Sequence, residues 1–404
     1  MNEREQHFKR VLPYYDLDGE FYALWDCFPI APEIQRELKR GMDKIGQIYE
    51  KFFRLLRHVD DDVLLALGFP ESVLPYVRLS VTTHPTIIGR GDWVWTKQGP
   101  KMLEFNTDTP TFIQEVYRAN GAACKKFRFK DPNQGEERHL RKAMQIAVAE
   151  TKTWLNLAGD PYVVFTAHHR SLEDYSTAQY LWSVLGKRNS AVFPLDEVYI
   201  DKEGLWDPHG RKIDILYRQT YPMEFLIDDK DDQDRPIGTM LLDLVTARRV
   251  GILNPISAFL LQNKAIQAVI WGLGEEQNQT FFTIEEVDAI RQYLLPTYLE
   301  KEPLLQTKYV QKPIFGREGN TVQIYSQDGT LYRHSPQHNY TYPSVFQQYV
   351  ELPTTTVSTP YGNESVYFLY GVFFLNGAAS ALGIRASTQE ITDNGSWFLP
   401  VGLT

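Results

Sequence analysis

Apolar residues recur at two different periods along this chain, and the two periods predict different elements. Spacings of three and four residues, with charged residues between them, are typical of amphipathic helices. The sequence shows this pattern over 32–58, 136–156, 237–249, 257–272 and 283–294. Capping signals support two helices: Ser171, with Asp174 three residues later, begins one that Gly186 ends, and Thr283 with Glu286 forms a capping box for another.

Continuous or alternating apolar runs predict strands around these helices. Runs at 162–167, 190–193 and 213–219 flank the helix that follows Ser171, and this strand–helix–strand order predicts a mostly parallel sheet. After residue 303 strands dominate, separated by glycine-containing turns. We therefore predict an α/β fold with a β-rich C-terminal part, an α/β (α+β) class.

One apolar stretch, residues 367–384, has nearly the length of a membrane-spanning helix and carries no charge. It contains three glycines and an Asn376-Gly377 pair, and its first half is rich in aromatic residues. These features predict two buried strands joined by a tight turn, so we expect no membrane segment here.

The composition indicates a globular protein and narrows its partners. The chain has 404 residues, a length typical of one lobed enzyme or of two to three domains. With 43% hydrophobic and 13% aromatic residues, it has enough apolar surface to offset the loss of chain entropy on folding. A net charge of −9 argues against a nucleic-acid binder. Cys27 and Cys124 lack metal-site spacing, and the charged N-terminus has no signal-peptide pattern, so we expect a reduced, cytoplasmic protein.

A predicted hairpin carries the first candidate site. If a three-residue loop centres on Gln98, Asp92 pairs with Glu104 and Arg90 with Asn106. Residues two apart on a strand share a face, so all four side chains project from one side. Two carboxylates and an amide suit Mg²⁺, and Arg90 can hold an anionic oxygen beside it. The alternative is an ordinary solvated polar face on a surface hairpin.

A glycine-rich loop at residues 316–320 is the second candidate. The preceding strand carries Lys312, and the loop contains Gly316, Arg317 and Gly319. Backbone amides of such a loop can hold phosphate groups while Lys312 and Arg317 neutralise them. The Walker pattern GxxxxGK[ST] occurs nowhere in the chain, and a plain glycine hairpin is the alternative interpretation.

Three other stretches are weaker candidates by themselves. Lys264 falls within the helix predicted over 257–272, where a solvent-facing lysine is the ordinary interpretation. The strand around Gln348 suits a nucleobase site or a plain core strand. His168 and His169 are adjacent and point in different directions, which argues against a shared metal ion. No GxSxG or HExxH motif supplies a hydrolase nucleophile or metal anchor.

Five strings, in order along the chain, resemble the synthetase half of the glutathionylspermidine synthase family, a branch of the ATP-grasp ligases. They are GRGDWVW, LEFNTDTPT, NKAIQAVIW, YVQKPIFGREGN and GIRAS. The resemblance implies an ATP-grasp ligase fold with a preATP-grasp-like parallel-sheet lobe. It divides the chain into a helical and hairpin region (1–130), that lobe (131–255) and a nucleotide-binding lobe (256–404). The amidase motif of bifunctional members is not found, so we do not expect hydrolysis of the product.

The resemblance also implies roles for individual residues. The positions that match the family's Mg²⁺ ligands are Asp92, Glu104 and Asn106, and those that match arginines at the reacting centre are Arg90 and Arg385. The ATP-binding positions fall on Lys264, Lys312, Gly316, Arg317, Gly319 and Gln348. The implied activity is an ATP- and Mg²⁺-dependent carboxylate–amine ligase that forms an amide through an acyl phosphate.

The substrates stay open at this point. The family joins a peptide or γ-glutamyl acid to a polyamine or amino acid, so small-molecule acids and amines are the expected partners. Residues 217–224 match the family's Tyr-Pro-Trp-Glu run only in part, and about ten residues are added near 274–283. The alternative is a catalytically silent ATP-binding protein of the same fold that acts through a partner. Such a protein would be expected to lack a metal ligand or phosphate lysine, and none is missing.

Overall fold

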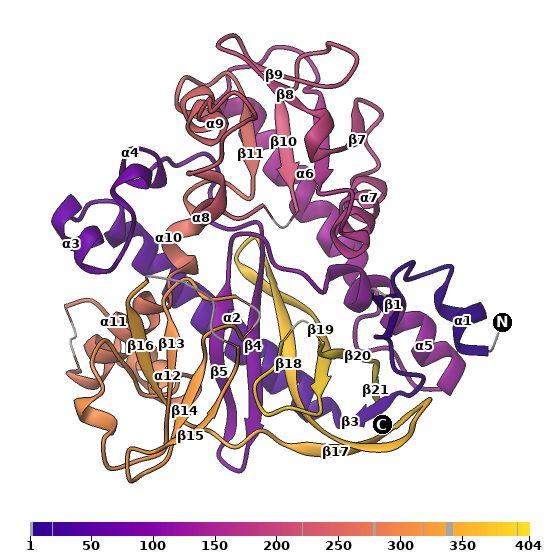
Figure 1. Cartoon of the computed structure of the whole chain (residues 1–404), viewed down its shortest axis with the longest axis vertical. Coiled ribbons are helices and arrows are strands. Elements are labelled where there is room, and N and C mark those ends of the chain that lie inside the picture. Colours follow the sequence, from indigo (N-terminus) through magenta and orange to yellow (C-terminus); the bar gives the residue numbers. More distant parts are fainter. Residues whose placement is uncertain are drawn as a thin grey trace.

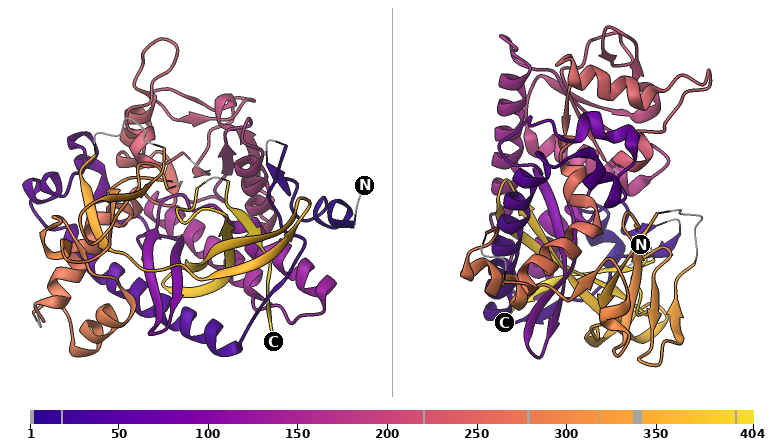
Figure 2. Two further views of the ribbon diagram at one scale, coloured as in Figure 1. Left: turned by 60° about the horizontal axis from the view of Figure 1, so that its bottom comes forward. Right: turned by 90° about the vertical axis from the view of Figure 1, so that its left-hand side faces the viewer.

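Three sheets organise the chain in the computed structural model, which describes residues 3–17, 19–219, 221–277, 280–317, 319–336, 342–393 and 395–404. A parallel sheet occupies one end of the long axis, and two antiparallel sheets lie next to each other at the other end (Figure 1). In the right-hand view of Figure 2 the orange and yellow strands of the C-terminal third stay in the lower half, away from the parallel sheet.

The parallel sheet has the strand order β11-β10-β6-β7, and every neighbouring pair in it is parallel. Its strands are β6 (Val163–Ala167), β7 (Ser190–Pro194), β10 (Ile215–Arg218) and β11 (Gly251–Leu253). Helices α6 (Glu136–Trp154), α7 (Leu172–Leu185) and α9 (Ile237–Thr246) belong to the same part of the chain. The Ser171 hydroxyl accepts from the Asp174 amide, and Gly186 ends α7 in the left-handed conformation, so both predicted ends of this helix are confirmed.

The largest sheet is antiparallel and contains the predicted hairpin. Its strands are β4 (Ile88–Thr96), β5 (Gly99–Asn106), β17 (Thr354–Thr359), β18 (Gly362–Leu375), β19 (Ala378–Ser387) and β20 (Trp397–Leu399). The long helix α2 (Pro32–Leu56) packs across β18 and β19. A Cβ on Gly46 of α2 would lie 2.3 Å from the ring of Phe374, so this glycine allows the close approach of helix and sheet.

The apolar stretch 367–384 forms parts of β18 and β19, as predicted. Asn376 and Gly377 join the two strands with φ angles of 44° and 83°, which suits a tight hairpin turn. Within the described ranges, no helix combines the length and the apolar character needed to cross a bilayer.

The third sheet has the order β12-β16-β13-β14-β15 and is antiparallel. Its strands are β12 (Thr297–Tyr298), β13 (Tyr309–Pro313), β14 (Gln323–Tyr325), β15 (Leu331–His334) and β16 (Ser344–Gln348). Helix α11 (Lys264–Glu275) packs against β12 and β16, and α10 (Ala258–Gln262) and α12 (Ile284–Tyr293) contact α11. The predicted capping box of Thr283 and Glu286 is confirmed at the start of α12.

The prediction of one helix over 257–272 is wrong at a single residue. Asn263 is extended, and its side chain accepts from the backbone N–H of Ala265, so it caps a new helix. Lys264 thereby becomes the first residue of α11 instead of a residue on the outer face of a continuous helix.

Short elements complete the chain. They are α1 (Glu3–Phe8), β1 (Asp16–Leu17), β2 (Glu20–Phe21), β3 (Phe28–Ile30), α3 (Asp61–Ala66), α4 (Leu74–Val77), a π-helical segment (Glu115–Ala119), α5 (Asn120–Phe127), β8 (Tyr199–Ile200), β9 (Leu205–Trp206), α8 (Met223–Leu226) and β21 (Val401–Leu403), with 3-10 turns at Glu71–Val73, Leu195–Glu197 and Glu302–Leu304.

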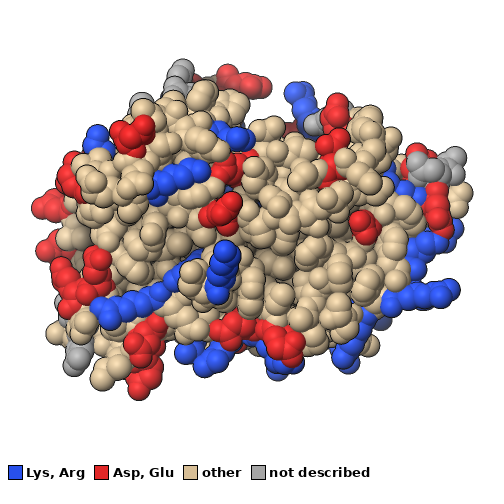
Figure 3. Space-filling model, turned by 90° about the horizontal axis from the view of Figure 1, so that it is seen from below, with Lys and Arg blue, Asp and Glu red and all other residues tan. Residues whose placement is uncertain are grey.

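The packed interior and the surface fit a globular protein of this composition. Two clusters of buried hydrophobic residues lie beneath the sheets, one of them around α2 and the other around α6 and α7. On the face shown in Figure 3, positive and negative side chains are interspersed among neutral ones, without one large area of a single sign.

Candidate functional site

The hairpin of β4 and β5 brings the four predicted site residues into register. Arg90 lies opposite Asn106, and Asp92 lies opposite Glu104, as the sequence predicted. The side chains of all four line cavities on this part of the sheet. The arrangement of these residues therefore follows from strand pairing alone.

The loop that sets this register differs from the prediction. Thr96 pairs with Gly99, so the turn contains two residues instead of three. This turn by itself would move the pairing by one residue, but a β-bulge between Asp92 and Trp93 moves it back. The bulge is the structural reason that the predicted pairs are correct although the predicted loop was wrong.

Gly91 lies between the two site residues of β4 and faces away from them. A Cβ at this position would meet the indole nitrogen of Trp93 at 2.6 Å and the sulfur of Met42, on α2, at 2.7 Å. The glycine therefore lets β4 pack tightly against its neighbours while Arg90 and Asp92 point to the site.

Arg90 and Asp92 form a buried, bidentate ion pair. Arg90 donates from Nε to Asp92 Oδ1 at 2.7 Å and from Nη2 to Oδ2 at 3.0 Å, and it donates from Nη1 to the Thr111 carbonyl at 2.9 Å. Burial alone would lower the pKa of Arg90, but the Asp92 carboxylate outweighs it and raises that pKa. The side chains are only 6% and 4% exposed, so the alternative of a solvated surface face does not hold for this pair.

Glu104 is held in its ionised form by surrounding positive charge. Its Oε2 lies 3.4 Å from Lys264 Nζ, and its Oε1 accepts from Asn106 Nδ2 at 3.3 Å. Burial would raise the pKa of Glu104, but Lys264, Lys312 and Arg90 together lower it to about 2. The carboxylate is therefore an anionic oxygen donor at neutral pH.

Two lysines meet at this carboxylate. Lys312, on β13, is buried and donates to the Leu103 carbonyl at 3.2 Å. Burial lowers its pKa to about 8, with Lys264 contributing in the same direction and Glu104 opposing. Lys264 donates to the carbonyl of Gly316 at 2.7 Å, and its side chain is 11% exposed. The solvent-facing interpretation of Lys264 is thus wrong, because the break at Asn263 turns this lysine inward.

Two cavities adjoin at these residues. The narrower one, about 130 Å³, lies between the hairpin and the third sheet, and its wall includes residues 347–350, at the end of β16. The wider one, about 790 Å³, lies between the hairpin and the parallel-sheet lobe. Glu104, Gly319 and Thr392 line both cavities, so the two spaces meet beside the Glu104 carboxylate.

The structure brings every predicted site residue to one of these cavities. The narrow cavity is lined by Asp92, Glu104, Lys264, Lys312, Gly316, Gly319 and Gln348. The wide cavity is lined by Arg90, Asn106, Arg317 and Arg385, together with Glu104 and Gly319. Of the predicted glycine-rich loop, only Glu318 lies outside the described residues. Residues from all five strings of the sequence, together with Gln348, thus form one continuous site.

Sequence reasoning missed several residues of the wide cavity. The segment from His168 to Asp174, considered only as a metal site, lines this cavity without His169. It follows the carboxyl end of β6 and includes the first turn of α7. A usable signal was present, because loops at the carboxyl ends of parallel strands commonly form binding sites.

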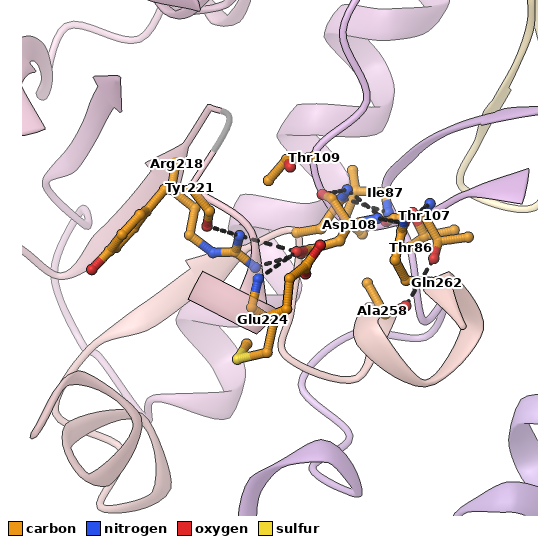
Figure 4. Close-up of polar contacts among 12 residues, drawn as sticks. Thr86, Ile87, Thr107, Asp108, Thr109, Arg218, Tyr221, Glu224, Ala258 and Gln262 are labelled. Carbon is orange, nitrogen blue, oxygen red and sulfur yellow. Dashed lines mark hydrogen bonds and ion pairs between the residues drawn. The ribbon is translucent and has the colours of Figure 1, made fainter. Parts of the chain in front are cut away.

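A network of buried polar contacts behind the wide cavity was also missed (Figure 4). Arg218 and Asp108 form an ion pair in which neither side chain is exposed to solvent. Nearby, Arg317 donates from Nε to Glu224 Oε1 at 2.6 Å and from Nη1 to Thr109 Oγ1 at 3.3 Å. The partners are between 93 and 208 residues apart, and no local pattern in the sequence reveals such pairs.

The donor set on the hairpin suits a hard divalent cation. Asp92, Glu104 and Asn106 supply two carboxylates and one amide oxygen, and the ionised state of Glu104 matches this chemistry. Among the described residues, no group of three or more His, Cys, Asp or Glu side chains is placed to hold a metal. A site with so few protein ligands leaves positions for water and phosphate oxygens, as Mg²⁺ sites usually do.

The fold is that of the ATP-grasp type, an α/β fold with a parallel-sheet lobe. A solved structure of a glutathione synthetase-like effector from Globodera pallida, in its apo form, matches it with a TM-score of 0.59. The match covers 100% of this chain and 98% of that one at 12% sequence identity, which shows a shared fold. The fold class predicted from the sequence is confirmed.

The chain belongs to the family described as glutathionylspermidine synthase preATP-grasp, whose family model matches residues 25–404. The "Bifunctional glutathionylspermidine synthetase/amidase" of Escherichia coli K12 is 25% identical over 377 residues, covering 83% of this chain and 55% of that protein. A "Putative acid--amine ligase" of Haemophilus influenzae is 23% identical over 332 residues, covering 78% of this chain and 74% of that protein. This chain thus spans about half the length of the E. coli relative, and the family is one of amide-forming ligases.

Proposed function

We propose that this protein is an ATP- and Mg²⁺-dependent ligase that joins a carboxylic acid to an amine through an acyl phosphate. The observation that carries the proposal is the meeting of the two cavities at Glu104. A narrow, partly apolar cavity with two lysines suits a nucleotide, and a wide cavity with several arginines suits an anionic substrate. The reacting groups would meet where the cavities join.

The narrow cavity would hold ATP with its phosphates toward Glu104. Lys264 and Lys312 lie at that end, and the loop residues Gly316 and Gly319 line the same space. Both ammonium groups would neutralise phosphate charge, and the backbone N–H groups of the loop can donate to phosphate oxygens. Residues 347–350, at the end of β16, would face the base.

The hairpin would hold the metal ion. Asp92, Glu104 and Asn106 would be its protein ligands, and Arg90 would orient the Asp92 carboxylate through their paired hydrogen bonds. When bound, Mg²⁺ supplies neutralisation of the negative charge on the transferring phosphoryl group.

The wide cavity would hold the acid and the amine. Arg90, Arg317 and Arg385 line it, and their guanidinium groups would bind the acyl phosphate and then the tetrahedral oxyanion that forms when the amine attacks. Glu173 and Asp174 line the same cavity on the side of the parallel-sheet lobe. Their carboxylates would favour a cationic amine, which supports small-molecule acid and amine substrates.

ADP release by the purified protein tests this function. The protein would be incubated with Mg-ATP and a panel of γ-glutamyl peptides, amino acids and polyamines, with mass spectrometry of the products. ADP and an amide from one acid–amine pair is the expected result. Lys264→Ala should lose this activity, whereas Lys101→Ala should retain it, because Lys101 lies on the same hairpin but contacts the backbone of Arg291 and Leu294 instead.

Two other outcomes have distinct meanings. No ADP from any pair, with Mg-ATP still raising the melting temperature, would favour the catalytically silent nucleotide-binding protein over the ligase. No ADP and no change in melting temperature would refute the nucleotide site itself.

A further inference from the structure

Arg317 connects the glycine loop (residues 316–320) to the parallel-sheet lobe. Its Nε donates to Glu224 Oε1 at 2.6 Å, and its Nη1 donates to Thr109 Oγ1 at 3.3 Å. The Arg317 side chain is 18% exposed and that of Glu224 only 1% exposed. One edge of the guanidinium is therefore held from the lobe side, while Arg317 also lines the wide cavity.

The residue that holds Arg317 is itself fixed. Glu224 lies on the short helix α8, just after β10, and the first amide of that helix, from Met223, donates to Asp108 Oδ2 at 3.0 Å. Asp108 also forms an ion pair with the fully buried Arg218, as Figure 4 shows. A chain of contacts thus runs from the end of the hairpin through α8 to the glycine loop.

Gly319, two residues after Arg317, packs closely against its surroundings. Gly319 has a φ angle of +68°, and a Cβ there would be 2.3 Å from the carbonyl oxygen of Thr392. Thr392 lines both cavities. Gly319 is therefore packed against Thr392 where the two cavities meet, and Arg317, two residues earlier, is held by Glu224.

Glu224 is costly to bury, which argues that it does more than fill space. Its second oxygen, Oε2, is buried and has no hydrogen-bond partner within the described part of the chain. An unsatisfied buried carboxylate oxygen is unfavourable for folding, so an apolar residue would serve packing better. Among the described residues, the side chain of Glu224 has one polar partner, Arg317.

We propose that Glu224 is a positioning residue that holds the Arg317 guanidinium in place at the wide cavity. For its meaning in catalysis the proposal rests on the ligase function above. Its physical content, the contact that restrains Arg317, does not depend on any substrate and can be tested separately.

Arginine labelling tests the contact without substrates. Phenylglyoxal reacts with accessible guanidinium groups, and the rate at Arg317 can be read by mass spectrometry of peptides, with the exposed Arg36 as internal reference. Glu224→Gln should speed labelling of Arg317 by about tenfold, because loss of one charge-assisted hydrogen bond changes an equilibrium by about that factor. An unchanged rate at Arg317 would overturn the proposal.

Two further variants protect this test. If Glu224→Gln does not fold, Glu224→Asp takes its place in the experiment. Its side chain keeps the charge but is one methylene shorter, so it should also release Arg317. Asp243→Asn is the matched control: Asp243 accepts from Tyr76 between α9 and α4 and does not line either cavity, so labelling of Arg317 should stay at the wild-type rate.

A double-mutant cycle separates positioning from a structural role once an active acid–amine pair is known. Glu224→Gln and Arg317→Ala should each lower kcat, and the double variant should be no slower than Arg317→Ala alone. Additive losses would show that Glu224 does not act through Arg317 and would overturn the proposal. If no pair yields ADP, faster labelling in Glu224→Gln still supports the contact, so failure of the ligase function and failure of this inference are distinguishable.

Discussion

Lys312 should make ATP binding depend on pH in the range just above neutrality. Its pKa is lowered from 10.5 to about 8, first by burial and then by Lys264, with Glu104 opposing. A protonated lysine neutralises phosphate, and a neutral one does not. The protonated fraction falls from about 0.9 at pH 7 to about 0.1 at pH 9, so the affinity for Mg-ATP should fall about tenfold between these values.

Calorimetric titration of Mg-ATP from pH 6.5 to 9.5 would measure this change, with Lys312→Met as the control. The variant should bind ATP more weakly at pH 7 and should lack the decline around pH 8, because it has no group that titrates there. A wild-type affinity that is constant over this range, or a decline of equal size in Lys312→Met, would refute the assignment of Lys312 to the phosphates.

The same pKa has a consequence for stability, and its sign is fixed by linkage. The folded state binds the Lys312 proton less tightly than the unfolded state, so burial of the charged ammonium destabilises the fold. This destabilisation is fully present below pH 8, decreases between pH 8 and pH 10.5, and is absent above pH 10.5. A shift of this size corresponds to about 3 kcal/mol at neutral pH. Lys312→Met should therefore unfold at a higher denaturant concentration than the wild type at pH 7, although it binds ATP less well. A lower unfolding midpoint would contradict this reasoning.

Three further substitutions test the framework of the site. Asp92→Asn should lower the free energy of unfolding by roughly 3 kcal/mol in urea titration, because it leaves the buried Arg90 without its counter-charge; a loss below about 0.5 kcal/mol would contradict the burial of this pair. Gly91→Ala should cost roughly 1–3 kcal/mol, since the added Cβ meets Met42 at 2.7 Å, and an unchanged melting temperature would disprove the tight packing. Asn263→Ala should cost about 1 kcal/mol through loss of the helix cap and should weaken ATP binding, and intact ATP affinity would show that the cap does not position the lysine that follows it.

The parts of this molecule that the sequence predicted are those with local causes. The ends of α7 follow from Ser171 and Gly186, and the turn at Asn376 and Gly377 follows from the preference of this pair for positive φ. The pairing of Asp92 with Glu104 was also correct, although the predicted loop was not, because a bulge compensated for the shorter turn. Local patterns thus place residues on faces even when they miss the details of the backbone.

The errors arose where tertiary contacts decide between two locally acceptable structures. Residues 257–272 have a helical pattern throughout, but Asn263 also donates to the carbonyl of Leu67, almost two hundred residues earlier. This contact, together with the cap that the Asn263 side chain provides for α11, favours a break in the helix. The break turns Lys264 toward Glu104. Periodicity alone cannot report a partner so far away in the chain.

Burial of charge is the second feature that the sequence left open, and it changes how the site is understood. The hairpin could have been a solvated polar face, on which Asp92→Ala would affect only chemistry. In the structure the Asp92 carboxylate balances the charge of Arg90 inside the protein, so Asp92 serves both the proposed metal site and the fold. A variant that reports on the metal alone is better made at Asn106, which donates a hydrogen bond to Glu104. The negative charge of Glu104 is already balanced by Lys264, Lys312 and Arg90, so the loss of Asn106 should have little effect on the fold. If Asn106→Ala keeps the wild-type unfolding midpoint but requires more Mg²⁺ for half-maximal ADP release, the two roles of the hairpin are separated.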